Sequence, residues 1–405
     1  MVSSSIDHMV SLIIFIGATL LFIGMFGSTI QTALVYQNNH ATAIRASDIL
    51  DSMLLNPGSP TTWGRTEVNP TVFGLQSPEF TQYKLDPYSL MRLDVSSNPL
   101  VSYNNAGDIR LYSDLSQGAN SYLYMTKDSL LNYSTALKML GLNSTYGFQL
   151  TLTPILDISI TENQTSNPLR LGIKVDGAGF PLANAKVNYK LYQLNLNSNQ
   201  YPSFNIINGT TTTDNTGAAS VPFPQITSNT QSYVFLVSVS LSGLNGIGYH
   251  VGNVPSGPHV VPIIGNMTSS QILLTHSGDV DLPYTTGVDL TYNTTMVNFN
   301  QEDFSFQSLA VNDTKTLTSG GGYPCGNITL AREPSILIIG YNSTATQGGF
   351  SLMPWGLSSL SYSVTFGTLS SSAWVSTDLR QVTIGGIAYQ VKISVWNTNE
   401  YQVNE

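Results

Sequence analysis

The chain has few charged residues. They make up 10% of its 405 residues, against ~25% in an ordinary soluble domain. Only 15 are Lys or Arg, they are scattered, and the net charge is −9. Nucleic-acid binding requires a basic face that displaces condensed counterions, so this composition excludes a nucleic-acid partner. Apolar residues still reach 41%, which also excludes a chain that is disordered through excess charge.

Residues that carry chemistry are equally scarce. Cys325 is the single cysteine, so no internal disulfide can form and the fold must be stabilised by packing. Gly-x-Ser-x-Gly, His-Glu-x-x-His and phosphate-cradling Gly loops are absent. His276, Asp279 and Asp281 are ligand types for a divalent ion, but their spacing matches no recognised ligand set and fits a polar turn around Gly278. We therefore predict no catalytic residue, no metal site and no cofactor, and an anchored surface enzyme is only the third hypothesis.

One long apolar run dominates the start of the chain. From Met9 to Tyr36 it contains no Asp, Glu, Lys or Arg, and roughly 20 apolar residues are enough for a helix to cross a bilayer. The next breaker is Asn56-Pro57-Gly58, so a single helix is predicted to continue to Leu55. Its second half has apolar residues at helical spacing, with Thr42 and other polar residues mostly elsewhere; the predicted buried face is Ala43, Ala46, Ile49, Leu50 and Met53.

Two interpretations of the run are open, a retained anchor and a cleaved signal. The first eight residues contain no Lys or Arg and the run is too long for a signal peptide, so we favour a retained single-pass anchor in the lipid bilayer of the cell membrane. Within the helix, small residues let helices approach closely in bilayers. The candidate assembly residues are Gly17, Gly24, Gly27 and Ser28, together with Asp7 before the run.

The rest of the chain is predicted to be mainly β. Alternating apolar residues begin at Phe148, and turn signals separate several further strands. The predicted fold is a long N-terminal transmembrane and amphipathic α-helix followed by two Ig-like β-sandwich domains. The predicted parts are a helix over 1–56, a mixed segment over 57–145 that packs on the stalk with a short helix near 129–140, an Ig-like sandwich over 146–250, a linker over 251–262, and a β domain over 263–405 closed by a hairpin at Gly385-Gly386.

The first β region resembles the bacterial Ig-like repeats of invasin and intimin type. The motifs are Lys174-Val, Gly179-Phe-Pro-Leu-Ala-Asn-Ala-Lys-Val-Asn-Tyr189, Thr212-Thr-Asp-Asn-Thr-Gly-Ala218 and Tyr233-Val-Phe-Leu-Val-Ser-Val239. The resemblance covers about Pro168 to Tyr249. It implies a stalk or spacer module without a catalytic residue.

Nine Asn-x-Ser/Thr triplets follow the membrane half. Such triplets are glycan acceptors when they are exposed outside the cytoplasm, although an Asn- and Ser/Thr-rich chain also produces some by chance. We expect glycans on several of them, which places the head outside the cell. The candidates are Asn132, Asn143, Asn163, Asn208, Asn266, Asn293, Asn312, Asn327 and Asn342.

The N-terminal helix resembles that of type IV pilins and pilin-like proteins, particularly archaeal ones. The resemblance covers about residues 3–55, from Ser-Ser-Ser-Ile-Asp-His through the long helix, and Asp7 matches the family's acidic residue near the mature N-terminus. It departs from the family because no basic leader precedes Ser3 and the head is large, which favours a minor or tip subunit. The first hypothesis is a surface structural protein that assembles with itself or with other pilin-like subunits.

The alternative hypothesis is an anchored extracytoplasmic protein that binds a sugar, a surface glycan or a protein partner without polymerising. Low charge and abundant Ser, Thr and Asn also suggest an acidic external medium, in which carboxylates protonate while neutral polar groups keep their hydration.

Overall fold

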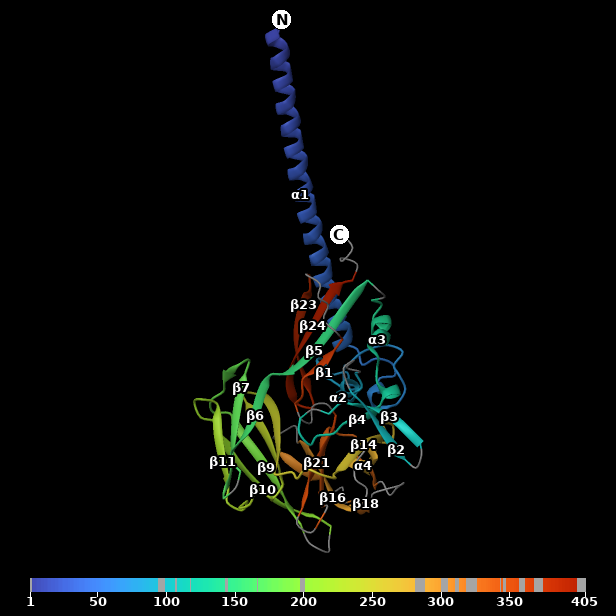
Figure 1. Cartoon of the computed structure of the whole chain (residues 1–405), viewed down its shortest axis with the longest axis vertical. Helices are drawn as coiled ribbons and strands as arrows, with labels where there is room; N and C mark the ends of the chain where they lie inside the picture. The colour runs from blue at the N-terminus through green and yellow to red at the C-terminus, as the bar shows by residue number, and fades with distance from the viewer. Residues whose placement is uncertain are drawn as a thin grey trace.

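The computed structural model describes most of the chain, with short gaps. The described residues are 2–93, 99–105, 108–116, 118–142, 145–165, 167–196, 201–280, 288–299, 305–309, 313–317, 326–342, 344, 347–356, 361–367 and 374–398. Helix α1 (Val2–Leu54) projects from a head built almost entirely of β-sheets (Figure 1). The predicted fold class, mainly β with one long apolar N-terminal helix and sandwich-like packing, is confirmed.

Helix α1 is continuous over 53 residues, which corresponds to about 80 Å at ~1.5 Å per residue. It ends where predicted, since the amide of Leu55 still donates to the Asp51 carbonyl and the Pro57-Gly58 turn follows. Every side chain from Ile6 to Asn38 is exposed, whereas the last turns are inserted in the head (Figure 1). The helix therefore consists of a free half and a docked half.

The docked half packs on strands β23 and β24, with one correction to the predicted face. Ala46, Ile49, Leu50 and Met53 are buried as predicted. Ala43, however, is exposed and Thr42 is buried at 8% exposure. Thr42 lies one turn before Ala46 on the same face, and its hydroxyl donates to the Asn38 carbonyl at 2.9 Å, which satisfies the buried hydroxyl.

The sheet that receives the helix combines strands from distant parts of the sequence. Its hairpin turns at Gly385-Gly386 as predicted, with φ angles of 56° and 85° that favour glycine. The expected sandwich starting at residue 146 differs from the observed pairing, because β5 pairs with β24 and not with β6. The strand order is β1 (Lys84–Leu85), β23 (Ser376–Ile384), β24 (Ile387–Asn397), β5 (Tyr146–Pro154) and β22 (Val364–Phe366).

Two sheets over residues 156–252 form a sandwich around a core that includes Leu171, Val187 and Phe235. One sheet contains β11 (Ala218–Phe223), β7 (Leu169–Gly177) and β6 (Leu156–Gln164), with β8 (Phe180–Pro181) paired to β7. The other contains β10 (Ser203–Thr212), β9 (Lys186–Asn195), β12 (Tyr233–Leu241) and β13 (Leu244–Gly252). Where a linker was predicted over 251–262, β13 ends at Gly252 and β14 begins at Val260.

Two further sheets complete the head. One has the order β19 (Gly326–Thr329), β15 (Gln271–His276), β14 (Val260–Asn266), β4 (Tyr124–Thr126), β3 (Asp108–Asp114) and β2 (Leu100–Asn105). The other has the order β17 (Phe306–Leu309), β16 (Leu290–Phe299), β20 (Ser335–Asn342) and β21 (Gly348–Trp355), with β18 (Thr314–Leu317) paired to β16. The sheet that contains β20 is covered on both faces, by β12 and β9 side chains on one and by β14 and β15 side chains on the other.

Short helices lie in the segment between α1 and β5. The helix expected near 129–140 is present as α3, which Asn132 caps and which Gly141, at φ 67°, follows. Part of the 57–145 segment packs on the helix as predicted: Trp63 and Phe73 share a core with the last turns of α1, whereas Phe80 is exposed and Tyr88 belongs to a different core. The short helices are η1 (Trp63–Arg65), α2 (Pro87–Met91), η2 (Lys127–Ser129), α3 (Tyr133–Met139) and, later in the chain, α4 (Ser277–Val280).

Candidate functional site

The free half of α1 is the first candidate site. Its large apolar side chains, such as Phe15, Leu21 and Phe22, are 69% to 72% exposed. No Asp, Glu, Lys or Arg lies between Asp7 and Arg45. It is the one described helix that is long and apolar enough to cross a membrane. A contiguous apolar surface of this size indicates a lipid or protein contact, because soluble proteins seldom leave one uncovered.

Four hydroxyls of the free half form hydrogen bonds within the helix. The hydroxyls of Thr19, Thr29 and Thr32 each donate to the carbonyl four residues earlier, at 2.8 to 2.9 Å. Ser28 donates to the Met25 carbonyl at 2.9 Å. Unsatisfied polar groups are costly in hydrocarbon, so these internal bonds make the helix compatible with lipid.

The predicted small residues lie along this helix, where no other described element packs against the glycines. A Cβ added at Gly17, Gly24 or Gly27 would meet nothing within 4 Å. At ~100° per residue, Gly17, Gly24 and Ser28 fall close to one face, while Gly27 is displaced to its side. Asp7 is exposed on the same helix and forms no ion pair with any described residue. Gly17, Gly24 and Ser28 therefore form an open strip that a second helix could approach.

Seven of the nine predicted glycan acceptors are described. Asn132, Asn163, Asn208 and Asn327 are exposed. Asn266 and Asn293 are half-buried, and the Asn293 amide donates to the Pro202 carbonyl at 2.9 Å. Asn342 is only 9% exposed and its amide oxygen accepts from Thr291, which leaves a glycan no room there. Asn143 and Asn312 lie outside the described residues, as do Asp281 and Cys325.

His276, one of the three residues weighed as metal ligands, has a structural role. His276 is 2% exposed, its Nδ1 accepts from the Gly278 amide at 3.0 Å, and its Nε2 lies 3.2 Å from the Val288 carbonyl. Both ring nitrogens therefore hold the turn that follows β15.

A pocket of ≈580 Å³ in the head is the second candidate site, and sequence reasoning missed it. Six of its 14 lining residues are charged, in a chain whose charged share is 10%. The sequence could have indicated this pocket only through the charged residues between Arg65 and Asp86. The other walls come from distant parts of the chain, and their charges are not close in sequence. The lining residues are Arg65, Ser77, Glu79, Lys84, Leu85, Asp86, Pro87, Asn298, Phe299, Gln307, Arg332, Glu333, Pro334 and Gly385.

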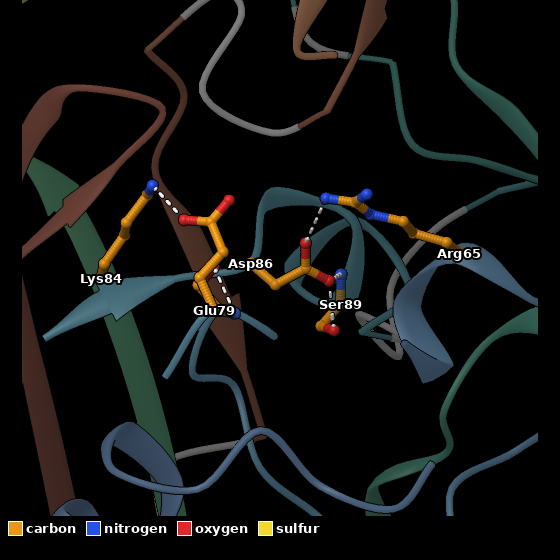
Figure 2. Close-up of polar contacts among 6 residues, drawn as sticks. Arg65, Glu79, Lys84, Asp86 and Ser89 are labelled. Atoms are coloured by element: carbon orange, nitrogen blue, oxygen red, sulfur yellow. Dashed lines mark hydrogen bonds and ion pairs between the residues drawn. The ribbon is translucent and has the colours of Figure 1, made fainter. Parts of the chain in front are cut away.

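Asp86 is the buried acid of this pocket, and the half-buried Arg65 lies beside it. Asp86 caps α2, with Pro87 at the first helical position, and its Oδ2 accepts from the Ser89 amide at 3.0 Å and the Ser89 hydroxyl at 2.7 Å (Figure 2). Its Oδ1 lies 3.8 Å from Arg65 Nη2, and the Arg65 guanidinium stacks 4.9 Å from the Tyr88 ring centroid. Burial raises the pKa of Asp86, and the Ser89 hydrogen bonds and Arg65 oppose that shift.

Lys84 and Glu79 form the exposed part. Lys84 Nζ donates to Glu79 Oε2 at 2.6 Å, and Figure 2 shows this pair beside the Asp86 cluster. The hydrogen bond and charge of Lys84 lower the pKa of Glu79. On another wall, Asn298 Nδ2 donates to Glu333 Oε2 at 3.2 Å. The pocket thus presents fixed donors and fixed acceptors together.

Comparison with known proteins places this chain in no established family. No protein-family model and no curated protein matches it. Among solved structures it is similar to Escherichia coli alpha-2-macroglobulin, at 10% identity and a TM-score of 0.21 over 72% of this chain and 23% of that one. The D0-D1 domain of intimin matches at 14% identity and a TM-score of 0.19, over 54% of this chain and 100% of that one. A bacterial ice-binding adhesin matches at 10% identity and a TM-score of 0.16, over 56% and 69%.

These likenesses are too distant to carry an argument. The chain spans less than a quarter of the alpha-2-macroglobulin that it matches. An intimin structure is among the matches, as the resemblance over Pro168 to Tyr249 led us to expect, but its TM-score is too low to support a shared function.

Proposed function

We propose that the protein is a single-pass, membrane-anchored surface structural protein whose free helix half lies in the lipid bilayer and whose β-rich head is extracytoplasmic. The observation that carries the proposal is the apolar run from Met9 to Tyr36, in which every side chain is exposed. The internally bonded hydroxyls support it, because they allow burial in hydrocarbon.

Membrane insertion is tested by flotation of the full chain with phosphatidylcholine vesicles. The full chain should float with the vesicles and resist extraction by alkaline carbonate. A variant that lacks residues 2–38 should stay in the aqueous fraction with a folded head, since the head core begins at Thr42 and Ala46. A full chain that remains in the aqueous fraction would reject the proposal.

We further propose that the protein assembles through this helix in the manner of pilin-like subunits, as a minor or tip component. The open strip of Gly17, Gly24 and Ser28 supports a close helix contact. Gly24→Ile should weaken association by about tenfold, which corresponds to ~1.4 kcal/mol. Ala33→Ile is the matched control, because nine residues at ~100° place Ala33 on the opposite face of the helix.

Association is measured by sedimentation of the full chain in detergent and by electron microscopy of native surface material. Equal effects of Gly24→Ile and Ala33→Ile would exclude this strip as the interface. If the protein is a stable monomer both in detergent and in native surface material, the second candidate function is favoured, an anchored binding protein. The charged pocket is the observation that supports this candidate.

A further inference from the structure

The pocket has the size and the composite walls of a small-ligand site. Its ≈580 Å³ lies within the ~300–1,000 Å³ that is usual for such sites. The walls come from η1, from the β1 and α2 segment, from β16 and β17, from the loop before β20, and from the hairpin at Gly385. Six separate segments converge on one pocket, which is more than the capping of α2 requires.

The charges in the pocket cancel. Arg65, Lys84 and Arg332 supply three cations, and Glu79, Asp86 and Glu333 supply three carboxylates, so the formal sum is zero. A ligand with a net charge would gain from one set and be repelled by the other. The lining therefore favours a ligand that is neutral overall and that both donates and accepts hydrogen bonds.

The polar groups are held in place and remain reachable. Arg65 is fixed by Asp86 and the Tyr88 ring but is still 33% exposed, and Lys84 is fixed by Glu79 but is still 31% exposed. A guanidinium has five N–H donors and an ammonium three, so each retains donors that these contacts do not use. Groups that are already ordered lose little entropy when a ligand binds.

Apolar surface lies between these groups. Leu85, Pro87, Phe299 and Pro334 contribute to the lining, and Phe299 packs with its ring centroid 5.0 Å from that of Phe306. A saccharide has the matching chemistry, since its hydroxyls donate and accept while its C–H faces pack on apolar carbon. We propose that this pocket binds a neutral polyhydroxylated ligand of mono- or disaccharide size.

The proposal makes the head a sugar-binding module and does not depend on helix assembly. The test uses the full chain in a detergent without a sugar headgroup, because glycoside detergents would compete. Glucose, galactose, mannose, maltose and lactose are titrated by calorimetry and by saturation-transfer NMR, with glucuronate and glucosamine as charged comparators. At least one neutral sugar should bind saturably, and both charged probes should bind at least about tenfold more weakly.

Two strand asparagines provide a matched pair of variants. Asn298 lines the pocket and its Nδ2 donates at 3.2 Å to Glu333, whereas Asn205 on β10 lies outside the pocket and its Nδ2 donates at 3.2 Å to Gln193. Asn298→Leu should lower the association constant about tenfold, the effect of losing one or two hydrogen bonds, and Asn205→Leu should leave it unchanged. Lys84→Met should also weaken binding without lowering the thermal midpoint, which separates ligand loss from misfolding.

Three results would overturn the proposal. They are the absence of saturable binding by every neutral sugar, tighter binding of a charged probe, and equal effects of Asn298→Leu and Asn205→Leu. Each can be observed whether or not the helix assembles, so failure here is distinguishable from failure of the proposed function.

Discussion

Arg92 is a fully buried cation, and no carboxylate is among its hydrogen-bond partners in the described part of the chain. Nε donates to the Ser129 carbonyl at 2.6 Å, and the other nitrogens donate to the carbonyls of Trp63 and Val68 and to the Asn69 side chain. Burial lowers its pKa to about 10, which keeps it charged at neutral pH. This single side chain ties the loop after α1 to the segment before α3.

Arg92→Lys tests that role. Lysine keeps the charge but has three donors at one point, so it cannot reproduce the planar fork that serves four acceptors. The free energy of unfolding should fall by about 2 kcal/mol or more. Arg170→Lys, at an exposed position of β7, should change it by less than about 0.5 kcal/mol. Urea unfolding followed by tryptophan fluorescence measures both, and a neutral Arg92→Lys would disprove the role.

Single positions show where sequence reasoning stops. Periodicity placed Ala46, Ile49, Leu50 and Met53 on the buried face of α1, but it could not tell that the face continues through Thr42. The triplet at Asn342 satisfies the motif, yet its strand is covered on both sides. A local pattern defines a residue's chemistry, whereas its exposure depends on which distant element packs over it.

At the scale of elements, Arg380 links helix α1 to the sheet that contains β23. Arg380 on β23 pairs with Asp51 at 3.3 Å, donates to Ser47 at 3.1 Å and pairs with Asp378 at 2.6 Å. Burial alone would raise the pKa of Asp378, but hydrogen bonds from the Leu379 amide and from Arg380 outweigh it and lower the pKa. The C-terminal part of α1 is therefore held on β23 by an ion-pair network that depends on ionised carboxylates.

Asp378→Asn should reduce the pH dependence of stability. The pKa of Asp378 is lower in the folded than in the unfolded state, so its contribution is complete above ~pH 4 and is lost as pH falls through the folded value. At pH 6 the variant should be less stable than the native chain by roughly 1 kcal/mol or less, because the pair is partly exposed. The difference should shrink below pH 4. Chemical denaturation at pH 6 and pH 3 measures it, and a constant difference would contradict this account.

Strand β20 is a second element for which the structure predicts a large loss of stability on mutation. All eight of its residues are buried, and Ile338 faces the core shared with β12 and β21. Ile338→Ala should cost about 2–5 kcal/mol through lost transfer energy and the cavity that it leaves. Ile109→Ala, at a site 64% exposed on β3, should be close to neutral. Comparable losses of unfolding free energy for the two variants in urea would contradict the burial of β20 on both faces.

Elements defined by local chemistry were predictable, and their partners were not. The continuous helix, the Gly385-Gly386 hairpin and α3 with its Gly141 stop follow from capping, turn and periodicity rules. The pairing of β5 with β24 joins residues more than 200 positions apart, and no period encodes it. The charged pocket shares that limit, since Asn298, Glu333 and Gly385 reach it only through the sheet packing.

At the scale of the molecule, four sheets are stacked one on another, and each neighbouring pair shares a hydrophobic core. The core of the 156–252 sandwich includes Val187 and Phe235; residues of the same strands, such as Tyr192 and Leu236, pack against the sheet of β20; and that sheet packs in turn against β14 and β15. The expectation of two sandwiches joined by a linker did not include this direct packing. The alternation within each strand shows that a face is buried, but not which sheet covers it.

The whole molecule should tolerate acid. Among the described residues, Asp86 is the one carboxylate in the interior, and its raised pKa means that protonation on acidification favours the folded state. Glu79 and Asp378 oppose this, because their lowered pKa values make stability fall below ~pH 4. Both are partly exposed, so their loss is small. The free energy of unfolding should therefore change by no more than about 2 kcal/mol between pH 7 and pH 4, as an acidic external medium would require. If the full chain unfolds or precipitates at pH 4 and is stable only near neutrality, these carboxylates do not offset one another. That result would also rule out an acidic external medium.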